Sequence, residues 1–376
     1  MKKLIFRKIL KDILHFFLLV SLSVTLIVWV IQAVNFLDIV SEDGHGFDIY
    51  FKYTLLNLPK IFSRIFMFMF FISVFYTILK YENNNELIVF WSNGITKKSF
   101  VNVIILFSLF FLVIQIVFTT YFVPKSQNKA RSYIRSSNID FFPSLIKEKK
   151  FIDTVSNLTI FIEKKDKDGE MKKIFLKEDI DKNTSQTIYA KKGKIISQNK
   201  KTYIKLFDGE IINIKNKKIN TFSFSETEID LSKYKTKTTT YPKIQEISTI
   251  TLLNCISFES FKLFFSSMRS EYNCKKNNTK IFFQEFFKRL YLPLYIPLVA
   301  LVSSVMILHS KDSFRFNRFK NIIFSTGIFL IILSEITVRY FGTNINYNLI
   351  LLFIPLVIFI LVYSSIFIFG NNYLKN

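Results

Sequence analysis

The stretch YENNNELIVFWSNGITKKSF, residues 81–100, is a polar segment set between two long apolar runs. It is too polar to cross a bilayer, and the asparagines at 83–85 can cap a short helix. Gly94 stands where a residue with a left-handed backbone would end that helix. The apolar side chains are expected to cluster on one side of it: Leu87, Ile88, Phe90 and Trp91. We predict a short amphipathic helix over 83–94, although a tight turn between two membrane spans would look similar.

The rest of the chain contains six apolar runs, in 376 residues of which 50% are hydrophobic. Each run is long enough to cross a hydrocarbon core of about 30 Å as a helix. The runs are residues 13–36, 55–79, 101–123, 286–308, 321–340 and 347–369. The sequence therefore predicts an α-helical membrane protein with six transmembrane helices in a 3+3 arrangement. The first run follows a basic N-terminus but lacks a cleavage pattern, so we expect it to be retained.

The polar stretch between the two triplets of runs is expected to be a soluble β domain. Segments such as NLTIFIEKK alternate in polarity, and Asp168-Gly169 and Asp208-Gly209 are typical of hairpins or loops. Short strands at this spacing predict an antiparallel sandwich or open barrel. A connecting helix is expected near 257–272. The predicted domains are 1–123 with the short helix at 83–94, 124–281 with the β domain and its connecting helix, and 282–376.

The orientation follows from charge in the short loops. Basic residues precede the first run. The loop between the second and third runs contains Lys80, Lys97 and Lys98, and the loop between the fourth and fifth runs contains Lys311, Arg315, Arg318 and Lys320. The positive-inside rule places both termini and the 83–94 helix in the cytoplasm. The β domain would then lie in the periplasm of a bacterial inner membrane. The formal charge of +23 accompanies abundant Lys, Asn, Ile and Phe, as an AT-rich genome would produce, and no nucleic-acid-binding motif occurs.

Motifs for enzymatic chemistry are absent from the sequence. It contains no G-x-x-x-x-G-K-[ST] loop, HExxH, GxSxG or CxxC, so we predict no catalytic, cofactor or metal site. Cys255 and Cys274 would face an oxidising compartment, which permits a disulfide. A helix of about 15 residues between them favours leaving them unpaired, because it exceeds the reach of a disulfide.

Cations recur at the outer ends of the predicted spans, where the positive-inside rule gives no reason for them. They are Lys60, Arg64, Lys288, Arg289 and Arg339. Cations at headgroup level suit a lipid that carries phosphate. The alternative is that they are interfacial anchors, partly neutralised by Glu285–Arg289 and Glu335–Arg339 pairs at i,i+4.

Three stretches together resemble the LptF/LptG permease family of the lipopolysaccharide exporter, over nearly the whole chain. LPKIFSRIFMFMFFISVFYTILKYENNNELIVFWSNGITKKSF resembles its second span and the polar turn that follows. QEFFKRLYLPLYIPLVAL is similar to its E-x-x-x-R-x-x-x-P opening of the fourth span, here Glu285, Arg289 and Pro293. YAKKGKI and YIKLFDGEI resemble its β-jellyroll repeats. IFIEKKDKDGEMKKIFLKED is closer to LptF than to LptG.

The resemblance implies a half-transporter without its own ATPase site. It would pair with a paralogous permease subunit, be driven by a cytoplasmic ABC ATPase dimer, and pass lipopolysaccharide from the periplasmic leaflet to a periplasmic jellyroll bridge protein. The implied coupling residues are Glu86, Leu87, Phe90, Trp91 and Gly94. The implied contacts with lipid phosphate are Lys60, Arg64, Lys288, Arg289 and Arg339, and the implied structural residues are Glu285, Pro293 and Glu335. The jellyroll interior would shelter the acyl chains.

Two other functions remain open from the residues alone. The chain could be the permease of another envelope ABC system that moves lipoprotein or peptide, although such permeases usually have four spans. It could also be a membrane-anchored β-domain scaffold without a transport role. A secondary transporter is disfavoured, because no pair of interrupted helices marks a midplane site.

Overall fold

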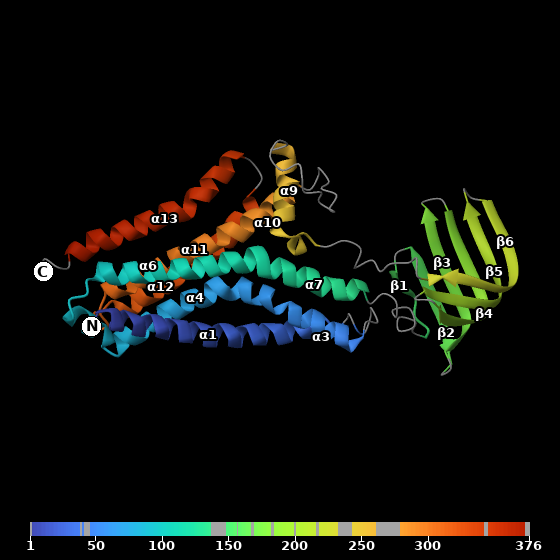
Figure 1. Cartoon of the computed structure of the whole chain (residues 1–376), viewed down its shortest axis with the longest axis horizontal. Helices are drawn as coiled ribbons and strands as arrows, with labels where there is room; N and C mark the ends of the chain where they lie inside the picture. The colour runs from blue at the N-terminus through green and yellow to red at the C-terminus, as the bar shows by residue number, and fades with distance from the viewer. Residues whose placement is uncertain are drawn as a thin grey trace. The chain divides into compact units, whose positions relative to one another are not determined.

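The chain divides into two compact units, which are described here from a computed structural model (Figure 1). The first unit comprises Met1–Trp29, Asn57–Gln127 and Lys243–Asn376, and the second comprises Val30–Leu56 and Asn128–Pro242. The structure describes residues 2–37, 40, 46–136, 148–155, 157–166, 169–181, 184–198, 201–215, 218–231, 243–260, 279–341 and 345–372.

Long helices form the first unit. The helical elements of the chain are α1 (Lys2–Asn35), α3 (Phe47–Leu56), α4 (Leu58–Asn83), α5 (Glu86–Ser92), α6 (Lys97–Val117), η1 (Phe118–Phe122), α7 (Val123–Ser136), η3 (Ile244–Glu246), α9 (Thr249–Ser260), α10 (Thr279–Tyr291), η5 (Leu292–Leu294), α11 (Tyr295–Ser304), η6 (Val305–Leu308), α12 (Phe316–Tyr340) and α13 (Ile345–Asn372). Within the described ranges, five stretches are long and apolar enough to cross a membrane: Lys2–Asn35, Phe47–Asn83, Lys97–Ile134, Lys280–Leu308 and Phe316–Tyr340. α13 adds a shorter apolar stretch, Ile350–Ile366. The predicted membrane-helical class is confirmed.

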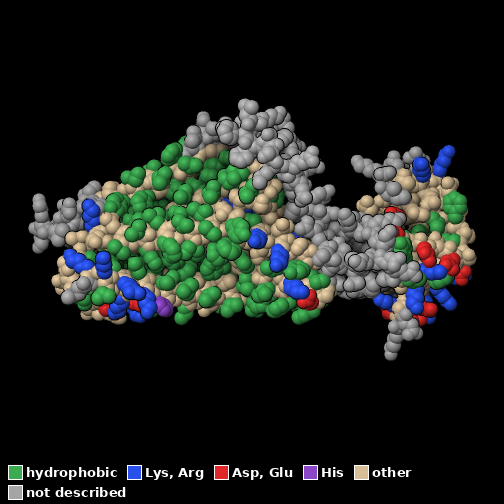
Figure 2. Space-filling model, viewed as in Figure 1, with side chains coloured by type: hydrophobic (Ala, Val, Ile, Leu, Met, Phe, Trp, Pro, Cys, Tyr) green, Lys and Arg blue, Asp and Glu red, His purple; other side chains and the backbone are tan. Residues whose placement is uncertain are grey.

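The centre of this unit is α11. All ten of its residues are buried, and it packs against α4, α6, α12 and α13. The surrounding helices expose large apolar side chains instead, such as Leu19 at 66% and Leu106 at 70%, which is the pattern expected of a lipid-facing surface. Figure 2 shows a broad apolar surface over the middle of the helices, with Lys and Arg gathered toward their ends.

α4 and α12 approach closely at a glycine. A Cβ at Gly327 would overlap the ring of Phe71, which is fully buried, and Phe71 also stacks on Phe324 with ring centroids 5.8 Å apart. A small residue at a helix crossing lets two backbones approach each other inside a membrane bundle. Gly327 therefore allows the close approach of α4 and α12, which belong to different triplets of helices.

The third long helix continues further than expected. We expected the soluble domain to begin at residue 124, but α7 remains helical to Ser136 and the first strand begins only at Ile152. Pro124 has no N–H for the carbonyl of Thr120 four residues earlier, and the turn before it is the π-helical segment η1. The helix thus passes a proline by widening one turn.

The β part of the second unit is one antiparallel sheet of six strands. Its strands are β1 (Ile152–Val155), β2 (Leu158–Lys165), β3 (Glu170–Asp181), β4 (Thr184–Gln198), β5 (Lys201–Lys215) and β6 (Lys218–Asp230). Each strand pairs with the next one along the chain, in the order β1-β2-β3-β4-β5-β6. The sheet is the β domain that was expected between the two triplets.

A crease runs across this sheet, visible in Figure 1 as strands that change direction. The ladder pairs Ile174 with Ala190 and Lys172 with Lys192, and skips Lys173, whose φ is 51°. β5 repeats this with Asp208, also at φ 51°, between the pairs Gly209–Ala190 and Phe207–Lys192. The crease is the row containing Lys173 and Asp208.

The crease also changes which side chains face the core. Buried positions are three apart across it, as in Met171 and Ile174, instead of the two expected of a strand. The left-handed backbone at Lys173 and Asp208 breaks the alternation, so the apolar side chains on both sides of the crease face one interior. Beyond the crease, Leu206 and Ile204 are fully buried in this interior.

Two turn predictions have different outcomes. The prediction that Asp208-Gly209 forms a hairpin or loop is wrong, because both residues lie within β5 and Asp208 bends it. Gly169 does lie in the turn between β2 and β3, at φ 81°, and its N–H donates to the Asp166 carbonyl (3.0 Å); Asp168 lies outside the described residues. The connecting helix is α9, which begins at Thr249, and the rest of the predicted 257–272 helix lies outside the described residues.

Candidate functional site

A cavity of about 110 Å³ lies where α4 begins and α6 ends. Four of the five cations that sequence reasoning singled out line it: Lys60, Arg64, Lys288 and Arg289. The three predicted structural residues line it as well: Glu285, Pro293 and Glu335. Arg339, the fifth cation, is not part of the lining and is exposed on α12. The cavity therefore collects charged side chains from helices of both triplets.

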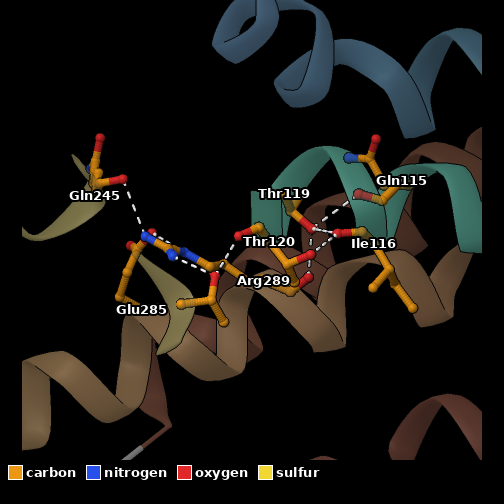
Figure 3. Close-up of polar contacts among 8 residues, drawn as sticks. Gln115, Ile116, Thr119, Thr120, Gln245, Glu285 and Arg289 are labelled. Carbon is orange, nitrogen blue, oxygen red and sulfur yellow. Dashed lines mark hydrogen bonds and ion pairs between the residues drawn. The ribbon is translucent and has the colours of Figure 1, made fainter. Parts of the chain in front are cut away.

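Arg289 lines this cavity, and Figure 3 shows its polar contacts. Its guanidinium donates to Glu285 Oε1 (3.3 Å), Thr249 Oγ1 (2.8 Å) and the Gln245 carbonyl (3.1 Å). The residue is 3% exposed, so these acceptors replace water around the charge. The predicted Glu285–Arg289 pair at i,i+4 is present.

Two threonines tie Arg289 to the π-helical turn, one through its backbone carbonyl and the other through its guanidinium. Thr119 Oγ1 donates to the Arg289 carbonyl (2.8 Å), and Thr249 Oγ1 donates to the Thr120 carbonyl (2.5 Å). Pro124 has no N–H to donate to the Thr120 carbonyl four residues earlier, so this carbonyl can accept from Thr249 of α9 instead. We call Arg289, Glu285, Thr249, Thr119 and Thr120 the arginine knot.

The remaining charges leave the cavity net positive. Lys288 Nζ lies 4.0 Å from Glu335 Oε2. Within the described part of the chain, Glu335 pairs with Lys288 and not with Arg339, contrary to the expected i,i+4 pair. Lys60 and Arg64 line the cavity without an ion pair among the described residues, so the cavity is suited to an anionic group.

Sequence reasoning missed the polar residues of this site, among them Gln115, Thr119 and Thr249. Gln115 is 5% exposed and lines the cavity from α6. A signal was present, because a lone amide in an apolar run such as VIILFSLFFLVIQIV is costly unless it faces a partner or a cavity. Thr249 could not have been found, since only the folded chain brings it to Arg289.

The predicted helix between the second and third spans is present as α5 (Glu86–Ser92). Gly94 has φ +68°, its N–H donates to Trp91 O (3.0 Å), and the Ile95 N–H donates to Phe90 O (3.1 Å). This pattern is a Schellman motif, and the burial of Ile95 and Phe90 supplies its apolar contact. The end of the helix is therefore as the sequence predicted.

The outward face of α5 differs from the prediction. Leu87 and Phe90 are 1% and 2% exposed and hold α5 to the helical core, so their contact with a partner stays a prediction. Ile88 and Val89 are the exposed apolar residues, at 59% and 50%. Placing Ile88 on the same side as Leu87 was wrong, because Leu87 and Phe90, three residues apart, form the buried face of the helix and Ile88 lies outside it. Trp91 is half-buried, with its ring centroid 5.9 Å from that of Phe100.

The start of α1 braces α5. Lys8 Nζ lies 3.4 Å from Glu86 Oε2, and Lys2 Nζ donates to the Gly94 carbonyl (3.0 Å). The rings of Phe6 and Phe90 pack edge to face with centroids 6.1 Å apart. Figure 1 shows the start of α1 and the end of α13 at the same end of the helical unit as α5.

Other candidate chemistry is limited. Among the described residues, no group of three His, Cys, Asp or Glu could hold a metal ion. Cys255 is 2% exposed and is disulfide-bonded, contrary to the expectation that it stays unpaired. Cys274 lies outside the described residues.

Comparison with known proteins identifies the family. The sequence model described as "Lipopolysaccharide export system permease LptF/LptG" matches residues 7–369. The chain belongs to the LptF/LptG family. Over 193 residues it is 23% identical to the "Uncharacterized protein RP871" of Rickettsia prowazekii (strain Madrid E). That match covers 51% of this chain and 53% of the relative, about half of its length. The family is described as one of lipopolysaccharide export permeases, and this member has apolar helices of membrane length and an inserted β domain.

Proposed function

We propose that the chain is one half of a heterodimeric permease that extracts lipopolysaccharide from the periplasmic leaflet of the inner membrane and passes it to a periplasmic jellyroll bridge protein. The observation that carries this proposal is the cavity beside the arginine knot, lined by Lys60, Arg64 and Lys288. Membership of the LptF/LptG family supports it. The assignment to LptF rather than LptG stays a prediction from the sequence.

In this proposal, the cations bind phosphate groups of the lipid. Lys60, Arg64 and Lys288 have side chains that face an open cavity, and multiple charge-assisted hydrogen bonds suit phosphate. Arg339 would contact the same headgroup from the exposed side of α12. We assign Arg289 to holding the cavity wall, because protein acceptors already surround it. Its direct contact with phosphate stays a prediction.

The creased sheet offers a second part of the path. A cavity of about 460 Å³ opens into its interior, lined by apolar residues such as Leu158, Leu176 and Ile188. Acidic side chains, Glu178 and Glu228 among them, also line it. An apolar interior with a polar rim would shelter acyl chains while the sugars stay in water.

The coupling element is α5. We propose that a cytoplasmic ABC ATPase dimer binds Glu86, Ile88 and Val89, with Leu87, Phe90 and Gly94 fixing the helix to the bundle and Trp91 at its edge. Both termini would lie in the cytoplasm and the β domain in the periplasm. The placement of α5 at the same end as the start of α1 and the end of α13 supports this orientation.

The experiment is co-purification of the full chain in mild detergent, with bound proteins and lipid identified by mass spectrometry. We expect an ATPase, a paralogous permease and lipopolysaccharide. Lys288→Glu should reduce bound lipopolysaccharide, whereas Lys320→Glu, on the same helix unit but outside the cavity lining, should not. A lipoprotein or peptide in place of the lipid would favour another envelope ABC permease. Recovery of neither an ATPase nor a phosphorylated lipid would favour a scaffold and reject the proposal.

A further inference from the structure

Gln115 has a side-chain amide whose orientation is fixed by its neighbour. Its Nε2 donates to the backbone carbonyl of Ser63 (2.8 Å) and to Ser63 Oγ (3.3 Å). A carbonyl oxygen can only accept, so the amide cannot be flipped without losing this hydrogen bond. Gln115 Oε1 is therefore held on the side away from the Ser63 carbonyl, and among the described residues it is buried without a hydrogen-bond partner.

The cavity next to Gln115 has room for a ligand group. Gln115 and Ser63 both line the cavity of about 110 Å³ that contains Lys60, Arg64 and Lys288. This volume holds several water-sized groups. A buried acceptor is costly when no donor reaches it, so an occupant that presents an O–H or N–H to Gln115 is favoured.

We propose that Gln115 Oε1 is a hydrogen-bond acceptor for a neutral donor, a hydroxyl or amide N–H, that neighbours the phosphate of a bound lipid headgroup. The inference rests on the proposed function and deepens it by stating which feature of the headgroup is recognised. The three cations bind any phosphate in the cavity. Gln115 distinguishes a phosphate on a sugar or polyol from a phosphate that has no donor beside it.

The chemical class that fits is a phosphorylated glycolipid. Its phosphate is attached to a ring that carries hydroxyl and amide donors, so one headgroup can satisfy the cations and Gln115 together. A site built to hydrogen-bond a substrate group discriminates against an analogue that lacks it, because the buried partner is then left unpaired. The Lys and Arg side chains around the cavity only donate, so they bind the phosphate but cannot accept a hydrogen bond from a hydroxyl or amide of the headgroup.

The test uses two lipids of equal charge and equal acyl chains. Phosphatidylglycerol carries two hydroxyls beyond its phosphate, and phosphatidylethanol carries none. The full chain, purified in mild detergent, should bind phosphatidylglycerol about fivefold more tightly, the effect of one hydrogen bond. Gln115→Met should abolish this ratio and leave binding of phosphatidylethanol unchanged. Equal binding of the two lipids by the unmodified chain overturns the inference, and this arm requires no variant to fold.

A matched control is Gln284→Met. Gln284 Nε2 also donates to a backbone carbonyl, that of Phe341 (2.6 Å), but Gln284 does not line the cavity. This variant should keep the fivefold preference for phosphatidylglycerol. Lys288→Met should weaken the binding of both lipids by a similar factor, so the ratio of their affinities should stay the same. A preference that survives in Gln115→Met overturns the inference. If neither anionic lipid binds better than phosphatidylcholine, the proposed function fails instead.

Discussion

Replacing Arg289 with methionine tests whether the arginine knot holds the bundle together. The substitution keeps an unbranched side chain of similar reach but removes the charge and every donor. It leaves Glu285, whose side chain is 18% exposed, without its ion-pair partner, and it deprives Thr249 and the Gln245 carbonyl of a donor. Removing one member of a buried pair costs about 3–5 kcal/mol. We expect Arg289→Met to lower the free energy of unfolding by this amount.

The assay is equilibrium unfolding of the full chain in mild detergent, followed by circular dichroism of the helices. Lys288→Met is the matched control, because Lys288 is the adjacent residue, is 37% exposed and lies 4.0 Å from Glu335. An exposed pair contributes about 0–1 kcal/mol, so this variant should change little. A double variant, Glu285→Leu with Arg289→Met, should recover part of the loss because no unpaired carboxylate remains.

A local measurement separates the knot from a general loss of stability. Hydrogen exchange of the amides in 243–250 should accelerate in Arg289→Met, because Gln245 and Thr249 lose their tie to α10. Exchange in α5, at the other end of the bundle, should stay the same. If Arg289→Met unfolds like Lys288→Met and the 243–250 amides are unaffected, the structural role given to Arg289 is wrong.

Three further predictions concern packing, strain and charge. Gly327→Ala should lower the unfolding free energy by about 1–3 kcal/mol through overlap with Phe71. Adding Phe71→Leu should relieve part of this cost in the same equilibrium-unfolding assay. Asp208→Gly should raise the melting temperature and Asp208→Val should lower it, because φ 51° suits glycine and not a β-branched residue. The hydrogen bond and charge of Lys172 lower the pKa of Asp166. The pair therefore stabilises the folded state at pH values above the ordinary pKa of Asp, and this stabilisation is lost as pH falls through the lowered pKa. NMR titration should show the Asp166 pKa rising in Lys172→Met, and an unchanged pKa would contradict the pairing.

The large divisions of the chain were predictable because they depend on composition along the sequence. Apolar runs of membrane length and an alternating polar stretch between them need no knowledge of tertiary contacts. The end of α5 was predictable for the same reason, since Gly94 is a local signal. Its outward face was not, because a helix of seven residues contacts α1 as well as its neighbours in sequence.

The crease shows a signal that the sequence contains but does not reveal by itself. Ala190 and Gly193 in β4 are buried positions three apart, and their ladder partners in β5 are Gly209 and Leu206. In a single strand such spacing resembles a turn, and Asp208-Gly209 was interpreted as one. Only the pairing shows that the interruptions fall in one row, where they fold the sheet without shifting its register.

The outer cations illustrate a different limit. Five were predicted to contact phosphate by their position along the spans, yet Arg289 is enclosed by protein acceptors. Its partner Thr249 lies 40 residues earlier in the chain, beyond the reach of any local pattern. Position along a helix predicts the depth of a charge in the membrane, whereas its partners depend on which helices meet.

Polar ties join the first triplet of helices to the second at both ends of the bundle, and their placement bears on how a push on α5 would travel. Near α5, the Lys311 backbone N–H donates to Glu82 Oε1 (2.8 Å), and Lys311 Nζ donates to the Asn83 carbonyl (3.0 Å). At the far end, Thr119 bonds the Arg289 carbonyl. Between these ends the two triplets are in contact through apolar packing around α11. Such packing resists compression, but unlike a hydrogen bond it is not directional. A displacement of α4 at Glu82 would therefore reach the α12 side directly, and would reach the lipid-binding cavity through α11 and the arginine knot.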